Sequence, residues 1–258
     1  MSIELIASAS AVGLLVGMLV LSEAGRRIGR VGLARDPEGL KGTGSAAAAV
    51  FGLLGLLIAF TFSGAASRFE ARRHLITEEA NAIGTAHLRL DMLPRDAQPE
   101  LRDLFRRYVD VRAGTYRKSA SIETRSAMLG EASALQRRIW SLALVACKRS
   151  DAPVQAMTLL VPALNEMFDI TTTRATATEN HPPLVILLLL GALSLIGALL
   201  VGYDLAPNGR RTWLHPALFA LMMSLAVYVI VDLEYPRQGF IRVDQADHVL
   251  TELRRNMQ

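Results

Sequence analysis

The sequence is poor in the residues that form crosslinks and catalytic sites. It contains a single cysteine, Cys147, so it can form no intramolecular disulfide and no cysteine-based metal site. No stretch of useful length alternates apolar and polar residues, which excludes an extended β-sheet. The G-x-S-x-G, phosphate-loop and H-E-x-x-H motifs are absent, and the five histidines are scattered. These absences predict an all-α protein that is not an enzyme and needs no cofactor.

Charge is almost absent from four segments of the chain. Each is about as long as the 20 apolar residues that a helix needs to cross a bilayer. They are predicted as transmembrane helices at residues 3–22, 45–66, 183–203 and 213–231. A pump or secondary transporter normally keeps an ionisable residue inside such helices, so the lack of one argues against coupled transport.

Elsewhere basic and acidic residues are interleaved, and the formal net charge is only +4. That balance is typical of a solvated helical surface and excludes a nucleic-acid partner. The predicted organisation is a first transmembrane hairpin at 1–66, a helical soluble region at 67–182, a second hairpin at 183–233 and a tail at 234–258. Glycines and Asp-Pro in GRRIGRVGLARDPEGLKGTG predict a loop between the first two spans, and DLAPNGRRT predicts a turn between the last two.

Within residues 67–182, apolar residues recur at steps of three and four, which indicates amphipathic helices. One helix continues from the second span to residue 92, and another, bent near Pro162, runs from about Pro153 to Asn180. The apolar faces predicted between them, over 99–119 and 122–147, comprise Leu101, Leu104, Phe105, Tyr108, Val111, Leu129, Leu135, Ile139 and Leu142.

The second span carries a face that suits a pore. Gly52, Leu56 and Phe60 are four residues apart and share one side of the helix. If copies of this helix surround an axis, these side chains could form an apolar constriction that gates by dewetting. The alternative is ordinary packing, because Gly52 and Gly55 let helices approach closely.

Charged residues follow this span at once. Arg68, Phe69, Arg72 and Arg73 stand where an aromatic ring and snorkelling arginines suit a membrane edge and a pore mouth. Glu78 and Glu79 could add a carboxylate ring or flank a seam of small residues where helices pack. Faces that could hold a metal, or could simply be exposed with paired side chains, comprise Glu70, His74 and Glu78, and also His87 and Asp91.

The junction AFTFSGAASRFEARRHL resembles the one in bestrophin anion channels, where a hydrophobic helix ends in an arginine and aromatics and continues into the soluble region. Together with EEANAIGTAHLR it resembles the bacterial bestrophin-like membrane family. Aligned through Arg68-Phe69, the neck residues of bestrophins fall on Gly52, Leu56 and Phe60. Two positions depart from that pattern, since Gly52 is not bulky and Glu70 replaces the second aromatic residue. No acidic cluster matches a calcium clasp.

The resemblance implies a homo-oligomer, a pentamer, that lies in the lipid bilayer of the bacterial inner membrane and conducts an anion such as chloride. The function expected from the sequence is therefore an oligomeric ion channel with its pore lined by the second span. The alternative is a non-conducting membrane sensor or scaffold whose soluble region binds a partner. Arginines in the two short loops favour a cytoplasmic position for both loops, by a thin margin over the basic residues elsewhere.

Overall fold

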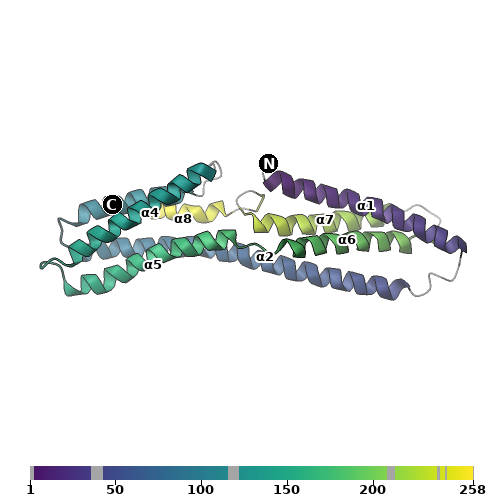
Figure 1. The fold of residues 1–258 in the computed structure, drawn as a ribbon, viewed down its shortest axis with the longest axis horizontal. Coiled ribbons are helices and arrows are strands. Elements are labelled where there is room, and N and C mark those ends of the chain that lie inside the picture. Colours follow the sequence, from purple (N-terminus) through teal and green to yellow (C-terminus); the bar gives the residue numbers. More distant parts are fainter. Residues whose placement is uncertain are drawn as a thin grey trace. The chain divides into compact units, whose positions relative to one another are not determined.

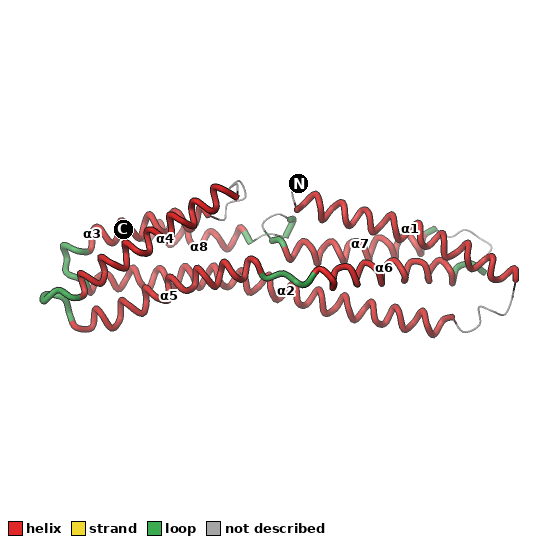
Figure 2. Tube along the Cα trace, viewed as in Figure 1, coloured by secondary structure: helices red, strands yellow, loops and turns green. Residues whose placement is uncertain are grey.

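The computed structural model describes residues 3–35, 43–115, 122–207, 213–236, 239–241 and 243–257, and over these residues it contains helices and loops but no strand (Figures 1 and 2). The fold is therefore all-α, as predicted. The elements are α1 (Ile3–Arg35), α2 (Thr43–Leu88), the 3-10 helix η1 (Arg89–Met92), α3 (Gln98–Thr115), α4 (Ile122–Cys147), α5 (Val154–Glu179), α6 (Leu184–Asp204), α7 (Leu214–Glu234) and α8 (Asp244–Asn256).

The chain forms two compact units, and α2 contributes to both. The membrane unit comprises Met1–Phe69 and His181–Ile241, and the body unit comprises Glu70–Asn180 and Arg242–Gln258. Four helices among the described residues are long and apolar enough to cross a membrane, and they are α1, α2, α6 and α7. The second of them is a single helix of 46 residues, so the predicted continuation of the second span is unbroken from Thr43 to Leu88, and the 3-10 helix η1 follows to Met92.

In the membrane unit, α1 packs against both α6 and α7, which also contact each other. The first part of α2 joins this core through Leu54, which is buried with Met18 and Leu190. The rings of Phe51 and Phe219 meet edge to face, with centroids 5.7 Å apart. Large apolar side chains remain exposed on the outside of this unit, which is the pattern expected of helices whose solvent is lipid.

Glycines bring α1 and α6 into backbone contact. A Cβ atom on Gly202 would lie 1.8 Å from the carbonyl oxygen of Ser22, and one on Gly25 would lie 2.0 Å from that of Leu199. Small residues at such a seam allow the close approach on which membrane helices rely, because lipid supplies no hydrophobic force between them. The prediction of a loop over residues 25–44 is wrong for 25–35, where α1 continues, and for 43–44, where α2 begins. Gly25 and Gly29 serve packing against α6 rather than a turn. Residues 36–42 lie outside the described residues.

The body unit is a helical bundle with its own apolar core. The predicted face of α3 is buried, with Leu101, Leu104, Phe105 and Tyr108 each at most 3% exposed. On α4, Leu135 and Ile139 are buried as predicted, but Leu129 is 37% exposed. The prediction for Leu129 is therefore wrong, because the buried stripe of α4 runs through residues 132, 135, 139, 143 and 146 instead.

Two further helices, α5 and α8, complete the body unit. Helix α5 continues through Pro162 from Val154 to Glu179. Within the predicted tail, Leu250 of α8 and Met257, the residue after that helix, are buried in the core of the body unit. Arg254 of α8 donates a hydrogen bond to Asp110 of α3 over 3.0 Å.

Candidate pore helix and its ion pairs

One face of α2 is exposed along its whole length. An α-helix has 3.6 residues per turn, so Leu88, about 36 positions after Gly52, is about ten turns away and lies on the same side of the helix. Eleven residues on or near that line are exposed in the single chain, and they are Gly52, Leu56, Ala59, Ser63, Ser67, Glu70, His74, Thr77, Asn81, Thr85 and Leu88; Ala66 and Gly84 beside them are half-buried. We refer to this set as the exposed face of α2.

The predicted constriction residues all lie on or beside this face. Leu56 is 53% and Phe60 is 68% exposed. A Cβ atom on Gly52 would meet nothing within 4 Å. Neighbouring Leu54 points the other way and is 2% exposed. Gly52, Leu56 and Phe60 therefore face outward from the single chain, and packing in its core does not explain their spacing.

Arg68 lies on the opposite side of α2, where it pairs with the end of α7. Its Nε donates to Glu234 over 2.9 Å and 3.2 Å to the two carboxylate oxygens, and a second guanidinium nitrogen reaches Oε1. Glu234 is 1% exposed. His181 places Nδ1 3.6 Å from the same carboxylate and stacks on Tyr235. A two-point arginine pair of this kind fixes geometry as well as charge, so Arg68 joins α2 to α7.

Arg72 is also turned inward and caps a helix. Its Nε donates to the carbonyl of Ala177 over 3.0 Å, and another guanidinium nitrogen donates to that of Asn180 over 2.7 Å. These carbonyls end α5, where backbone acceptors lack helical partners and a positive charge is favourable. Arg72 is 7% exposed, so the expectation that it shapes a pore mouth is corrected to a capping role.

Glu79 sits in the core of the body unit between two arginines. It is 0% exposed, and Arg112 of α3 and Arg174 of α5 each donate a hydrogen bond to a different carboxylate oxygen. Burial acts to raise the pKa of Glu79, but the two guanidinium groups outweigh it and hold that pKa below its usual range. Glu79 is therefore not part of an exposed carboxylate ring, and it ties α2 to α3 and α5.

The remaining charged residues stay exposed on or beside the exposed face of α2. Glu70 pairs with Arg73 over 3.4 Å, and Nδ1 of His74 lies 3.1 Å from Glu78. These are side-chain pairs three and four residues apart on a helix surface. Among the described residues, no group of three or more acidic, histidine or cysteine side chains could hold a metal. Phe69 packs against the core of the membrane unit.

The other candidate metal pair binds an arginine instead. Arg102 of α3 lies 3.4 Å from Nε2 of His87 and donates to the carboxylate of Asp91. Burial and the charge of Arg102 lower the pKa of His87 below its ordinary value. In α5, Thr171, Thr173 and Thr178 donate to carbonyls three or four residues earlier, a common use of helical hydroxyl groups.

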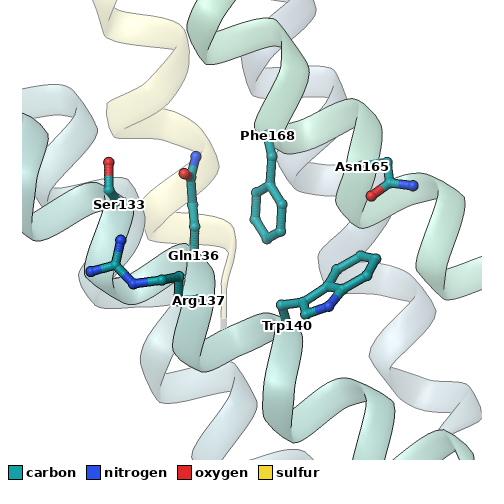
Figure 3. Close-up of a pocket in the computed structure, with 6 residues that line it drawn as sticks. All are labelled: Ser133, Gln136, Arg137, Trp140, Asn165 and Phe168. Carbon is teal, nitrogen blue, oxygen red and sulfur yellow. The ribbon is translucent and has the colours of Figure 1, made fainter.

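A groove of about 550 Å³ lies between α4 and α5 of the body unit. Figure 3 shows Trp140 and Phe168 facing each other there, with Asn165 beside them and Arg137 extended toward Ser133. The two rings are 6.2 Å apart. Gln136 at the same groove donates to the hydroxyl group of Tyr108 over 3.1 Å.

The ion pairs that hold α2 could not be assigned from sequence. Glu234 is 166 residues from Arg68, and Arg112 and Arg174 are 33 and 95 residues from Glu79. The sequence shows only on which side of α2 these residues lie, through their positions around the helix. Positions 68, 72 and 79 all fall about half a turn from the line through Gly52 and Glu70, which places them on the buried side.

Over the described residues, four helices are long and apolar enough to cross a membrane, and the others form a helical body. This arrangement is that of an α-helical integral membrane protein. The chain belongs to the bestrophin-like family, because the model of the Bestrophin-like domain matches residues 12–247.

Solved structures share this fold. Two single-residue variants of a bacterial bestrophin homologue from Klebsiella pneumoniae match with TM-scores of 0.65 and 0.66, at 15% and 14% identity. Each match covers 94% of this chain, and 99% and 97% of those chains. A structure described as a membrane protein matches with a TM-score of 0.66 at 16% identity, covering 92% of this chain and 95% of that one. Among curated proteins, none matches this chain.

Proposed function

We propose that this protein is an oligomeric ion channel of the bacterial inner membrane, with a pore lined by the exposed face of α2. The observation that carries the proposal is the length of that face, whose eleven residues are exposed in the single chain from Gly52 to Leu88. A ring of copies around one axis would enclose it. Membership of the bestrophin-like family supports a channel of this kind.

In this proposal, Leu56 and Phe60 form the hydrophobic constriction, and Gly52 leaves the pore wider one turn away. Apolar side chains in a narrow pore gate it by dewetting, since water leaves a small apolar passage at low cost. The mouth is formed by Glu70, Arg73 and Glu78. Arg68, Arg72 and Glu79 are not included, because their side chains are engaged on the other side of α2.

By resemblance to bestrophins, the assembly would be a pentamer and the ion an anion such as chloride. The exposed mouth residues supply two carboxylates and one guanidinium per copy, so they contribute no excess positive charge. Recording purified protein in planar bilayers with asymmetric potassium chloride tests whether the protein conducts and which ion permeates. A current supports the channel, and the sign of its reversal potential identifies the permeating ion.

A cysteine series tests the pore lining directly. Cysteines at Gly52, Leu56 and Phe60, in a background with Cys147→Ala, should react with small hydrophilic thiol reagents and lose current on reaction. A cysteine at Leu54 is the matched control, because that position is buried on the opposite side and should stay unreactive. Equal protection at all four positions would contradict a water-lined face.

The groove between α4 and α5 favours a second candidate, a non-conducting sensor or scaffold. Its aromatic pair and its amide and guanidinium groups could receive a protein segment. In that case Trp140→Ala would abolish partner binding, no current would be recorded, and cysteines on the exposed face of α2 would be shielded.

A further inference from the structure

The chain folds back on α7 just after that helix ends. Helix α7 ends at Glu234, yet the backbone N–H groups of Phe240 and Ile241 donate to the two carboxylate oxygens of Asp232 over 3.0 Å and 2.8 Å. Asp232 is 3% exposed. The carboxylate of the helix therefore receives a returning segment of main chain, and we call Asp232 with residues 239–241 the carboxylate clasp.

Gly239 is required for this approach. A Cβ atom on Gly239 would lie 1.8 Å from Oδ1 of Asp232, which no side chain can accept. The backbone thus lies directly against the carboxylate. Ile241, at the other end of the clasp, packs into the core of the membrane unit. The clasp is held from both sides, by hydrogen bonds at Asp232 and by apolar contact at Ile241.

The clasp places Phe240 beside the apolar part of α7. The ring of Phe240 meets that of Tyr228 edge to face, with centroids 6.5 Å apart. Tyr228 precedes the end of α7 by six residues, which is about 9 Å along the axis at 1.5 Å per residue. The backbone of Phe240 is bonded to Asp232, just past the predicted span at 213–231, and its ring extends back along α7 to Tyr228 inside that span.

Phe240 is 85% exposed in the single chain. Four other apolar side chains of α7 are exposed as well, and they are Leu218, Leu221, Met222 and Leu225. Irregular backbone at membrane depth is stable only where its polar groups are bonded, and the clasp bonds both N–H groups at Phe240 and Ile241. The site thus combines two hydrogen-bonded backbone N–H groups with an outward aromatic ring.

We propose that the carboxylate clasp seats Phe240 in the acyl region of the bilayer, so that lipid is the partner of this surface. The segment acts as a short re-entrant anchor that holds the end of α7 at a fixed depth. A phenylalanine ring suits this depth because it has no polar group to satisfy. The proposal concerns lipid contact alone and stands whether or not the protein conducts.

A spin label measures this environment. Phe240→Cys in the Cys147→Ala background is labelled and reconstituted into vesicles of phosphatidylcholine and phosphatidylglycerol. The ratio of collisions with oxygen to collisions with a water-soluble nickel chelate should be several-fold higher at residue 240 than at a Val154→Cys control. Val154 is equally exposed, at 85%, but begins α5 in the body unit.

Each other result overturns the proposal. A label at 240 that meets the nickel chelate as often as the control lies in water. An immobile label that meets neither reagent is covered by protein, which would identify a second copy of the chain as the occupant.

The clasp itself is tested by Asp232→Asn and, separately, by Gly239→Ala in the labelled protein. Either change should release the returning segment and raise nickel access at residue 240. If one variant fails to fold, the other decides. An unchanged oxygen-to-nickel ratio in a folded variant would show that the carboxylate does not hold Phe240 at its depth.

Discussion

The ion pairs of Glu79 predict how strongly the body unit depends on one buried carboxylate. Replacing Glu79 with Gln keeps the shape of the side chain but removes its charge, so that the buried Arg112 and Arg174 lose the carboxylate to which both donate. Breaking a buried ion pair by removing one partner costs about 3–5 kcal/mol, because the remaining charge is left desolvated.

This cost should appear in thermal unfolding. For a chain of roughly this size, 1 kcal/mol moves the melting temperature by about 2–4 °C, so Glu79→Gln should lower it by roughly 6–20 °C. The measurement is the melting temperature of purified protein in one detergent at one scan rate. Glu78→Gln is the matched control, since it removes the same charge from an exposed neighbour and should change stability by less than about 0.5 kcal/mol.

The same residue gives a dependence on pH. The folded pKa of Glu79 is held below its unfolded value, so its contribution to stability is present above the unfolded pKa and is lost as the pH falls through the folded one. Wild-type protein should lose stability in acid more steeply than Glu79→Gln. If Glu79→Gln and Glu78→Gln have the same melting temperature and the same acid profile, the interpretation of a buried ionic centre is wrong.

Three further changes are predicted. Gly202→Val should abolish stable folding of the membrane unit or lower the melting temperature sharply, because its Cβ would lie 1.8 Å from the carbonyl oxygen of Ser22. Arg68→Gln should destabilise by about 3–5 kcal/mol in thermal unfolding, because it leaves the carboxylate of Glu234 buried without that cation. The pKa of His87 is lowered in the folded protein, so folding favours its neutral form. The stability that depends on this neutral form is present above the unfolded pKa near 6.5 and is lost as the pH falls through the folded pKa. His87→Gln should therefore flatten the dependence of stability on pH below about pH 6.5.

Much of the fold follows from the hydropathy pattern. Membrane spans are long and uniform, so their existence follows from composition alone, and helix α4 occupies the residues predicted for it, Ile122 to Cys147. Glycine was the main source of error. Gly25 and Gly29 predict a loop, yet α1 continues through both, because a glycine that permits contact with another helix looks the same in sequence as one that permits a turn.

The sequence of the tail contains a pattern that predicts helix α8. Val249, Leu250, Leu253 and Met257 recur at helical spacing in the tail, and all four lie in or against the core of the body unit. By contrast, the partner of Glu79 could be identified only from the structure. Arg112 and Arg174 are two of many arginines in the body, and their choice depends on how α3 and α5 pack against α2.

The separation of charges on α2 follows from its helical phase. Arg68, Arg72 and Glu79 lie about half a turn from Gly52 and Glu70. Arg68 bonds to α7, Arg72 to α5, and Glu79 to both α3 and α5. The buried side of α2 is therefore fixed by ion pairs and hydrogen bonds to other helices, whereas the charged groups on its exposed side pair with one another along α2 itself. A helix fixed in this way cannot rotate about its axis without breaking buried pairs. Any rearrangement that opens a passage along α2 would consequently have to move the neighbouring helices together with it, or change only the rotamers of exposed side chains such as Leu56 and Phe60.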